Sequence, residues 1–261
     1  MINGKKIVIT GANSGIGYET LKILSLGKDN MILAVDKENS NIESFSPQVF
    51  AYKMDISTKE GVDSVFAEAI KVLGGIDIFY ANAGYPYYEL FDYTDWDRVK
   101  SMFETNVFSP IYTYSKFREY LNGRFGIYAV TVSAIGQMAM PGYAIYSSSK
   151  FAFEGFQQAL RLEMDKNIQL TCLYPVATDT NFFKTANPVE FEKPFPVQSA
   201  QHVAKKMVKG IEKGKKSVYP SKLLSLAKLL MKFFPIIRSI YWALEKKKLL
   251  RFKQKLAKNS K

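Results

Sequence analysis

The sequence predicts an α/β fold in which one parallel, doubly wound β-sheet carries helices on both faces and a basic helical extension follows. The first observation is that short apolar runs alternate along the chain with longer segments of helical periodicity. The second is that these short runs are hydrophobic at most positions, as expected of strands buried on both sides. The third is size, because 261 residues with 47% hydrophobic and 23% charged residues suffice for one globular domain.

The apolar runs define the expected strands, which are rich in β-branched and aromatic residues. These strands are residues 6–10, 31–35, 49–53, 76–80, 127–132, 168–174 and 217–219. The expected helices are residues 16–26, 59–73, 95–121 and 146–165. Such alternation implies right-handed crossovers, and ligands of sheets of this kind bind at the carboxyl ends of the strands.

Residue composition excludes several other classes of protein. The 16 Gly and 10 Pro are scattered and no internal repeat occurs, which argues against collagen-like, disordered and solenoid structures. The single Cys172 cannot form an internal disulfide, and together with the single His202 it is too little for a zinc cluster, so no metal site is expected. The charged start is followed by an apolar run, residues 7–9, that is too short for a signal peptide. We therefore expect a cytoplasmic protein.

Charge is distributed unevenly along the chain. Residues 1–220 hold 24 Lys and Arg against 23 Asp and Glu, whereas residues 221–261 hold 12 Lys and Arg against the single acid Glu245. The body is therefore nearly neutral and the extension carries a net charge of +11. A neutral body offers nucleic acid no second basic patch, so no nucleic-acid partner is expected.

The first expected strand runs directly into a glycine-rich turn, Thr10-Gly11-Ala12-Asn13-Ser14-Gly15-Ile16-Gly17. Glycines permit a tight turn and close approach of the backbone to a pyrophosphate, and the helix that follows directs its first N–H groups at the phosphates. The strand-turn-helix setting is the context that a dinucleotide-binding, Rossmann-type motif requires. We expect a cofactor to contact Gly11, Asn13, Ser14, Gly15, Ile16 and Gly17.

Asp36 follows at the end of the second expected strand, where a carboxylate can accept hydrogen bonds from both ribose hydroxyls. A 2′-phosphate at that place would meet a negative charge, which favours NAD(H) over NADP(H). The adjacent Lys37 partly offsets that charge, so NADP(H) stays possible.

Asp55-Ile56 follows the third expected strand, Asn82-Ala83-Gly84 follows the fourth, and Asn106, Ser133, Tyr146 and Lys150 come later in that order. Together with the glycine turn, these segments resemble the short-chain dehydrogenase/reductases, in their compact single-domain form with TGxxxGxG and YxxxK motifs, over residues 4 to about 220. The resemblance implies that Asp55 and Ile56 contact the adenine and that Asn82, Ala83 and Gly84 steady the central sheet beside the cofactor. It implies a catalytic tetrad of Asn106, Ser133, Tyr146 and Lys150, with Asn106 binding a water that links Lys150 to solvent. It also implies a homodimer or tetramer that pairs through the Asn106 and Tyr146 helices.

One segment departs from the family pattern. Where the family usually has Pro-Gly after the sixth strand, this chain has Pro175-Val176, and the Val176 side chain is expected to crowd the backbone's approach to the nicotinamide. Thr180 is retained in the family's threonine position, and with Thr178 it completes the expected cofactor contacts, which also include Tyr146 and Lys150.

The chemistry of the tetrad follows from its residue types. Tyr146 and Lys150 are four apart on an expected helix, so the ammonium can lie near the phenol, lower its pKa and let it give or take a proton at working pH. Ser133, at the end of the fifth strand, can donate a hydrogen bond to the substrate oxygen that gathers charge.

The expected substrate pocket is mainly apolar. Its walls should come from residues 85–88, 137–143 and 181–197, and the last segment supplies Phe182, Phe183, Phe191 and Phe195. An aromatic lid suits a lipophilic alcohol or ketone. The alternative, that these side chains pack as ordinary core, stays open.

Residues 221–261 lie past the last strand that the fold needs. Leucines and phenylalanines cluster before Pro235, isoleucines and Tyr241 follow it at helical spacing, and Pro235 should break the run into two amphipathic helices. Charged residues interrupt it too often for a membrane span. Contact with an anionic membrane surface is one expectation for this extension, and covering a partner subunit or roofing the pocket is the other.

The function predicted from these features is an NAD(P)(H)-dependent oxidoreductase that transfers a hydride between the nicotinamide and a lipophilic alcohol or carbonyl compound, with Tyr146 as general acid/base. The alternative is a non-catalytic, cofactor-binding redox sensor at a membrane or on a protein partner. A sugar-nucleotide epimerase is disfavoured because no second substrate domain is present.

Overall fold

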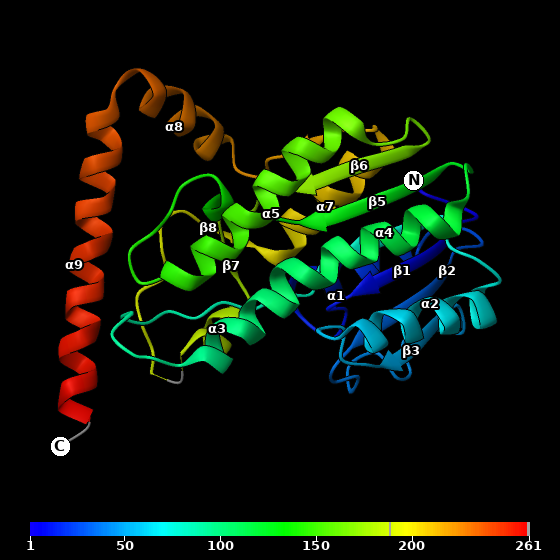
Figure 1. The fold of residues 1–261 in the computed structure, drawn as a ribbon, viewed down its shortest axis with the longest axis horizontal. Helices are drawn as coiled ribbons and strands as arrows, with labels where there is room; N and C mark the ends of the chain where they lie inside the picture. Colours follow the sequence, from blue (N-terminus) through cyan, green and yellow to red (C-terminus); the bar gives the residue numbers. More distant parts are fainter. Residues whose placement is uncertain (188, 260–261) are drawn as a thin grey trace.

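The computed structural model, which describes residues 1–187 and 189–259, is built around a seven-stranded parallel sheet (Figure 1). Its strands are β1 (Lys6–Thr10), β2 (Met31–Asp36), β3 (Val49–Lys53), β4 (Ile78–Ala81), β5 (Gly126–Thr131), β6 (Ile168–Leu173) and β9 (Ser217–Val218). They lie in the order β3-β2-β1-β4-β5-β6-β9, and every neighbouring pair is parallel. The chain moves outward from β1 to β3 and then returns to the other side of β1, which creates a switch point beyond the carboxyl ends of β1 and β4. The predicted α/β fold is confirmed.

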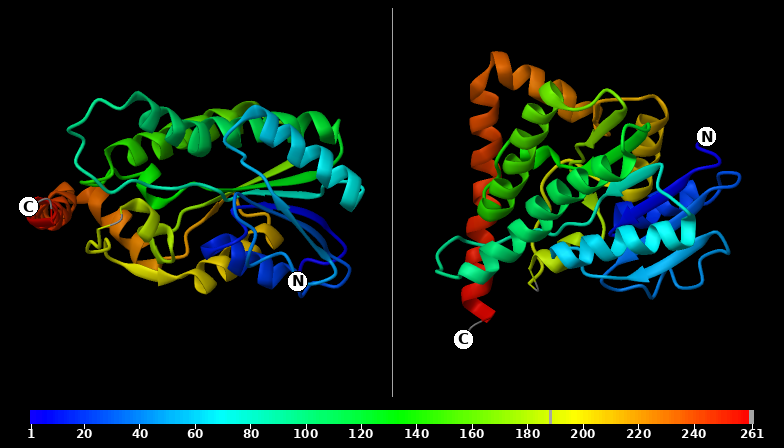
Figure 2. Two further views of the ribbon diagram at one scale, coloured as in Figure 1. Left: turned by 90° about the horizontal axis from the view of Figure 1, so that it is seen from below. Right: turned by 45° about the vertical axis from the view of Figure 1, so that its right-hand side comes forward.

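Helices cover both faces of this sheet. The helical segments are α1 (Gly15–Leu24), α2 (Lys59–Leu73), α3 (Trp96–Phe103), η1 (Glu104–Phe108), α4 (Ser109–Leu121), η2 (Ala134–Gly136), α5 (Ala144–Glu163), α6 (Phe182–Ala186), α7 (Ala200–Glu212), α8 (Lys222–Phe233) and α9 (Pro235–Asn259). Helices α2, α4 and α5 form one layer and α1 and α7 form the other, as the left view of Figure 2 shows. A separate pair of short strands, β7 (Ala177–Asp179) and β8 (Val197–Ser199), lies beside α7.

The strands are hydrophobic at most positions because both of their faces are covered. In β1, Val8 packs with the α2, α4 and α5 layer, whereas Ile7 and Ile9 pack with the α1 and α7 layer, and all three are fully buried. Successive side chains of a strand point to opposite faces, so a strand between two helical layers has no face in contact with solvent that would favour polar residues. This explains why the strand positions could be read from unbroken apolar runs.

Two helical segments differ from expectation. The single helix expected over residues 95–121 is divided, because the π-helical turn η1 separates α3 from α4. Pro110, the second residue of α4, has no backbone N–H to donate. Helix α7 was not expected, although Ser199 caps it by accepting a hydrogen bond from the backbone N–H of His202 at 3.2 Å.

The extension forms two helices, as the position of Pro235 predicts. Ser221 caps α8 and Pro235 is the first residue of α9, where a missing N–H costs nothing. Helix α9 runs along one edge of the molecule (Figure 1) and packs Tyr241, Leu249 and Phe252 against an aromatic cluster of the body. Within the described residues, none of the helices has the length and apolar character needed to cross a membrane.

Candidate functional site

A cavity of about 710 Å³ lies at the carboxyl ends of the central strands. Of the residues predicted to act in the site, those lining this cavity are Gly11, Ser14, Gly15, Ile16, Asp36, Asp55, Ile56, Asn82, Ala83, Gly84, Ser133, Tyr146, Lys150, Pro175, Val176, Thr178 and Thr180. Asn13, Gly17 and Asn106 are outside its lining. The fold therefore gathers segments from β1 through β7 around one space.

The turn after β1 is shaped by close backbone contact. Gly11 has a φ of +66°, in the left-handed region that favours glycine. A Cβ added to Gly17 would lie 2.0 Å from the carbonyl oxygen of Gly11, so only glycine lets α1 begin directly beneath the turn. The first N–H groups of α1 consequently point toward the cavity, where an anion is favoured.

A group of hydrogen bonds ties together the ends of β1, β4 and β5. The Asn82 side-chain amide donates to the carbonyl oxygens of Thr10 and Gly11, both at 3.2 Å, and its oxygen accepts from Thr131 Oγ1 at 2.9 Å. The Thr10 hydroxyl accepts from the backbone N–H groups of Asn82 and Ala83, both at 3.1 Å. We call this set the strand-end clasp. Thr131 was not predicted to take part, although its place two residues before Ser133 was a signal available in the sequence.

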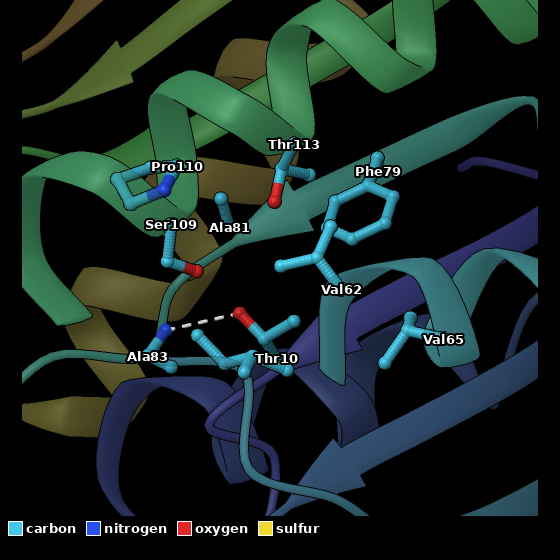
Figure 3. A pocket seen from close by; sticks show the side chains of 10 residues that line it. Thr10, Val62, Val65, Phe79, Ala81, Ala83, Ser109, Pro110 and Thr113 are labelled. Carbon is cyan, nitrogen blue, oxygen red and sulfur yellow. Dashed lines mark hydrogen bonds between the residues drawn. The ribbon is translucent and has the colours of Figure 1, made fainter. Parts of the chain in front are cut away.

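Figure 3 shows the side of the clasp that faces the α2, α4 and α5 layer. Here Ala83 bonds to Thr10 at the edge of a second cavity of about 10 Å³, and Ser109 and Thr113 of α4 lie across from them. This volume is at the lower limit for one water molecule, so the small cavity cannot be a ligand site.

Three charged groups lie at the far end of the large cavity. Asp36 accepts a hydrogen bond from the Asn13 backbone N–H at 3.0 Å. Lys37 pairs with Asp55 at 3.0 Å. Burial raises the pKa of Asp55, but hydrogen bonds from Ser57 and Lys37 outweigh that effect and leave it below its ordinary value. The Asp55 carboxylate is therefore poised to accept hydrogen bonds at neutral pH.

The side chain of Asn13 turns out of the cavity. Its oxygen accepts from the Asn41 backbone N–H at 2.8 Å, and its carbonyl accepts from the Asn41 amide at 3.0 Å. The connection of Asn13 to the site is thus the N–H that it donates to Asp36, and its direct contact with a cofactor stays a prediction.

Ser133 has an unusual backbone conformation. Its φ of +107° is rare for a residue with a side chain and costs roughly 1–3 kcal/mol. The strain is held by backbone hydrogen bonds, since the N–H groups of Val132 and Ser133 both donate to Leu173 of β6. The conformation places the hydroxyl within hydrogen-bond reach of Tyr146.

Tyr146 and Lys150 share one face of α5 and are both buried. The Lys150 Nζ lies 5.7 Å from the centre of the Tyr146 ring and donates to the carbonyl oxygen of Thr131 at 3.2 Å. Burial lowers the pKa of Lys150 from 10.5 to about 8. Burial also raises the pKa of Tyr146, although the Ser133 hydrogen bond acts in the opposite direction. The expectation that the pKa of Tyr146 lies below its ordinary value is wrong for this arrangement, because removal from water dominates.

Asn106 holds the loop that follows β4. Its amide donates to the Tyr85 carbonyl at 3.0 Å and to Ser149 Oγ at 3.2 Å, and its oxygen accepts from the Tyr85 N–H at 3.2 Å. Asn106 lies within the π-helical turn η1, a feature often found at functional sites. A Cβ on Gly84 would come within 2.8 Å of the Asn106 oxygen, so the loop can approach only because Gly84 has no side chain. The implied water-binding role of Asn106 stays a prediction.

The other end of the cavity is apolar. Its predicted wall residues include Met138, Met140, Tyr143, Phe182, Phe183 and Phe195. Phe191, predicted as a lid residue, instead stacks on Tyr88 with ring centres 4.1 Å apart and belongs to the neighbouring core. Residue 188 of the expected lid and residues 260–261 of the extension lie outside the described residues.

Residues of the extension also line this apolar end. A roof over the pocket was one of the alternatives that the sequence left open for the extension. Leu223, Leu224, Ala227, Met231, Ile237 and Tyr241 contribute to the wall. No local pattern could identify them, because their contribution depends on where α8 and α9 fold back.

Comparison with known sequences gives consistent similarities. A family model described as short chain dehydrogenase matches residues 5–190. The chain is 27% identical over 245 residues to 17-beta-hydroxysteroid dehydrogenase 13 of Rattus norvegicus, covering 90% of this chain and 80% of that protein. It is 31% identical over 234 residues to 3-dehydrosphinganine reductase of Danio rerio, covering 82% of this chain and 70% of that protein.

Solved structures share the fold. A short chain dehydrogenase/reductase from Burkholderia phymatum in complex with NAD matches with a TM-score of 0.74 at 17% identity, over 89% of this chain and 96% of that chain. An alcohol dehydrogenase from Thermococcus sibiricus complexed with 5-hydroxy-NADP matches with a TM-score of 0.71 at 22% identity, over 82% and 94%.

The buried Lys150 should make the stability of the protein depend on pH. Its pKa is about 8 in the folded protein and 10.5 ordinarily, so between these values the unfolded chain holds a proton that the folded chain has lost. The free energy of unfolding of the wild type should therefore rise with pH in this window. Its difference from the free energy of unfolding of Lys150→Met should change by about 2–3 kcal/mol over the same window. Denaturant unfolding of both proteins at pH 7 and pH 10.5 measures this difference. A difference that does not change with pH would contradict a depressed pKa.

Proposed function

This chain belongs to the short-chain dehydrogenase/reductase family, and from that premise we propose that it is an NAD(P)(H)-dependent oxidoreductase of a lipophilic alcohol or carbonyl compound. The observation that carries the proposal is that Ser133, Tyr146 and Lys150 line the same cavity as the glycine turn. A dinucleotide site and a proton-transfer site are thus continuous. The redox-sensor alternative has no observation of its own to support it.

The residues present fit a dinucleotide cofactor. The turn from Gly11 to Gly15 and the start of α1 would hold the pyrophosphate, Asp36 the ribose, and Asp55 and Ile56 the adenine. Val176 is one of the residues that line the cavity, and the proposal requires that its side chain leave room for the nicotinamide. When bound, that ring supplies or takes up a hydride at the substrate carbon.

Tyr146 is proposed as the general acid/base. Its raised pKa keeps the phenol protonated at neutral pH, which suits donation of a proton to a carbonyl oxygen during reduction. Ser133 donates a hydrogen bond to the same oxygen as negative charge develops there. For oxidation of an alcohol the same phenol must first lose its proton, and the Lys150 ammonium and a positively charged nicotinamide both favour that loss.

The substrate class follows from the apolar end of the cavity. Methionine and aromatic side chains form most of its wall there. The two relatives described above are named for a hydroxysteroid and for dehydrosphinganine, which are both lipophilic. A lipophilic alcohol or ketone is therefore the class we propose.

The proposed location is the cytoplasm, with contact at a membrane surface. The free, buried Cys172 is compatible with a reducing compartment, and the basic extension suits an anionic surface.

Replacing Tyr146 tests its role most directly. Tyr146→Phe removes the proton donor and almost no volume, so turnover should fall by about 100-fold or more while cofactor binding stays within a few-fold of wild type. Tyr143→Phe is the matched control, because Tyr143 is also buried in the cavity wall and its hydroxyl has no partner among the described residues. Steady-state kinetics with a panel of alcohols and ketones and fluorescence titration with NADH measure both effects. Equal activities of the two variants would remove Tyr146 from the mechanism.

Replacing Asp36 tests cofactor choice. Asp36→Ala removes an acceptor for the ribose hydroxyls and the repulsion of a 2′-phosphate, so NADH affinity should fall by about tenfold and NADPH affinity should fall less or rise. Glu38→Ala, two residues away and exposed, should leave both affinities unchanged. Tighter binding of NADPH than of NADH by the wild type would show that Asp36 does not set the preference.

Assembly as a homodimer or tetramer is part of the proposal. Phe151 and Leu162 of α5 are 43% and 91% exposed and offer an apolar face for pairing. Sedimentation velocity at micromolar concentration should give at least twice the chain mass of 29.6 kDa, and Phe151→Arg should reduce it to one chain, because it would place a charge in the interface. Leu26→Arg, exposed at the opposite end of the sheet, is the control. A wild-type monomer would contradict this assembly.

A further inference from the structure

The surface of the extension has an unusual concentration of exposed apolar side chains. Of the 21 large apolar side chains that are exposed in the described part of the chain, ten lie between residues 223 and 250. Leu226, Leu229, Leu230 and Phe233 recur three and four residues apart on α8, so they form one face. Contiguous exposed apolar surface of this kind usually marks a contact site.

This face is additional to the one with which α8 packs on the body. Leu224, Ala227 and Met231 also recur three and four residues apart, and they line the large cavity. Lys228 extends back to Gln137 and hydrogen-bonds its side-chain oxygen, which anchors α8 to the loop after Ser133. Helix α8 is therefore fixed to the pocket by one apolar side and leaves a second apolar side uncovered.

The first half of α9 continues this uncovered apolar surface, and its second half carries cations instead. Its outward side begins with Ile236, Ile240 and Leu244, which are 65%, 55% and 53% exposed. On the same side of the helix, Lys247 follows at helical spacing and is exposed. One turn further, Arg251 pairs with Glu192 of the body at 3.0 Å. In Figure 1, α9 is the outermost element on its edge of the molecule, and the exposure of Ile236, Ile240 and Leu244 shows that the body leaves this side uncovered.

The charge of the extension selects the partner. Its single acid, Glu245, is buried and paired with Lys248 at 2.8 Å, so it does not offset the exposed cations. Two copies of the chain that met through this surface would bring two net charges of +11 together, which is repulsive. A surface that is apolar at its centre and cationic beyond it is complementary to the interface of an anionic lipid bilayer, where apolar side chains insert and cations meet lipid phosphates.

The rim of the large cavity lies next to this surface. Leu223 of α8 and Phe195 both line the cavity, and both are exposed, at 47% and 64%. The Tyr241 hydroxyl of α9 donates to the carbonyl oxygen of Phe195 at 2.8 Å, which holds that rim against the extension.

We propose that the outward face of α8 and of the first half of α9 lies in the interface of an anionic membrane, with the cavity rim at Leu223 and Phe195 turned toward the bilayer. A lipophilic substrate then enters from the lipid phase without crossing water. This last consequence rests on the proposed function, whereas the docking itself does not.

Vesicle binding tests the docking face. The full-length wild type should co-sediment with phosphatidylcholine vesicles containing about 30% phosphatidylserine and bind pure phosphatidylcholine less. Leu229→Gln/Phe233→Gln removes two apolar side chains that do not line the cavity and should weaken binding by about tenfold or more. Leu26→Gln/Phe125→Gln makes the same two changes at residues 76% and 64% exposed elsewhere and should leave binding unchanged. Moderate salt should weaken wild-type binding without abolishing it.

Tryptophan quenching tests the orientation. Tryptophan placed by Phe233→Trp or Phe195→Trp should be quenched by vesicles whose phosphatidylcholine carries brominated chains, whereas Phe125→Trp should not. Signals of the native Trp96 and Trp242 are subtracted with the wild type.

The proposal is overturned if the wild type does not bind anionic vesicles, if the two double variants bind equally, or if salt removes all binding. It is also overturned if Leu229→Gln/Phe233→Gln turns an oligomer into a monomer, because the face would then join two copies. Quenching at Phe233 but not at Phe195 would overturn the placement of the rim. No substrate is used, so an inactive protein that binds vesicles argues against the proposed oxidoreductase alone.

Discussion

The strand-end clasp is the constraint on which the site depends. Asn82 holds the carbonyl groups of the glycine turn on one side and Thr131 on the other, so three separate strand ends keep one geometry. Thr131 then accepts from Lys150, which fixes the lysine beside Tyr146. The hydrogen bonds of the clasp are partly buried, so losing one partner would leave a polar group with reduced access to water unpaired. The glycine turn and the proposed proton-transfer group Tyr146, which are far apart in sequence, are thereby held as one unit.

Burial determines the direction in which the pKa values of Tyr146 and Lys150 shift. Burial disfavours the charged forms of both Tyr146 and Lys150, and a hydrogen bond with the strained Ser133 acts against this effect on the phenol. The protein thus keeps a neutral phenol beside a lysine whose pKa is about 8. Any charge brought into the large cavity acts on them in a medium of low dielectric, where its effect is larger than in water.

Much of this arrangement could be predicted because it is local. Strands 6–10 and 49–53 and the helix 59–73 agree residue for residue with the structure, since unbroken apolar runs and regular apolar spacing determined them. The cofactor turn and the YxxxK pair are likewise contained in short stretches of sequence. Helix α7 was missed, although its apolar residues at 203, 207 and 211 and its serine cap were visible.

The properties that could not be predicted are those that arise from tertiary contact. The sign of the Tyr146 pKa shift depends on burial by distant segments, and sequence spacing shows the nearby lysine alone. The π-helical turn inside the 95–121 segment has no simple sequence signal, and it is what places Asn106 against the Tyr85 loop. Phe191 could not be separated from its lid neighbours until α9 supplied Phe252 as its packing partner.

Because α8 and α9 contribute to the cavity wall, two parts of the chain can change independently during evolution. Every residue proposed to handle the proton or the cofactor precedes residue 221, whereas part of the wall of the proposed substrate pocket follows the last strand. Insertions, deletions or exchanges in the final forty or so residues can change what fits the pocket without disturbing strand register, because no later strand has to find its place in the sheet. Descendants of such a protein are free to acquire new substrates at their carboxyl terminus while the reaction itself stays constant.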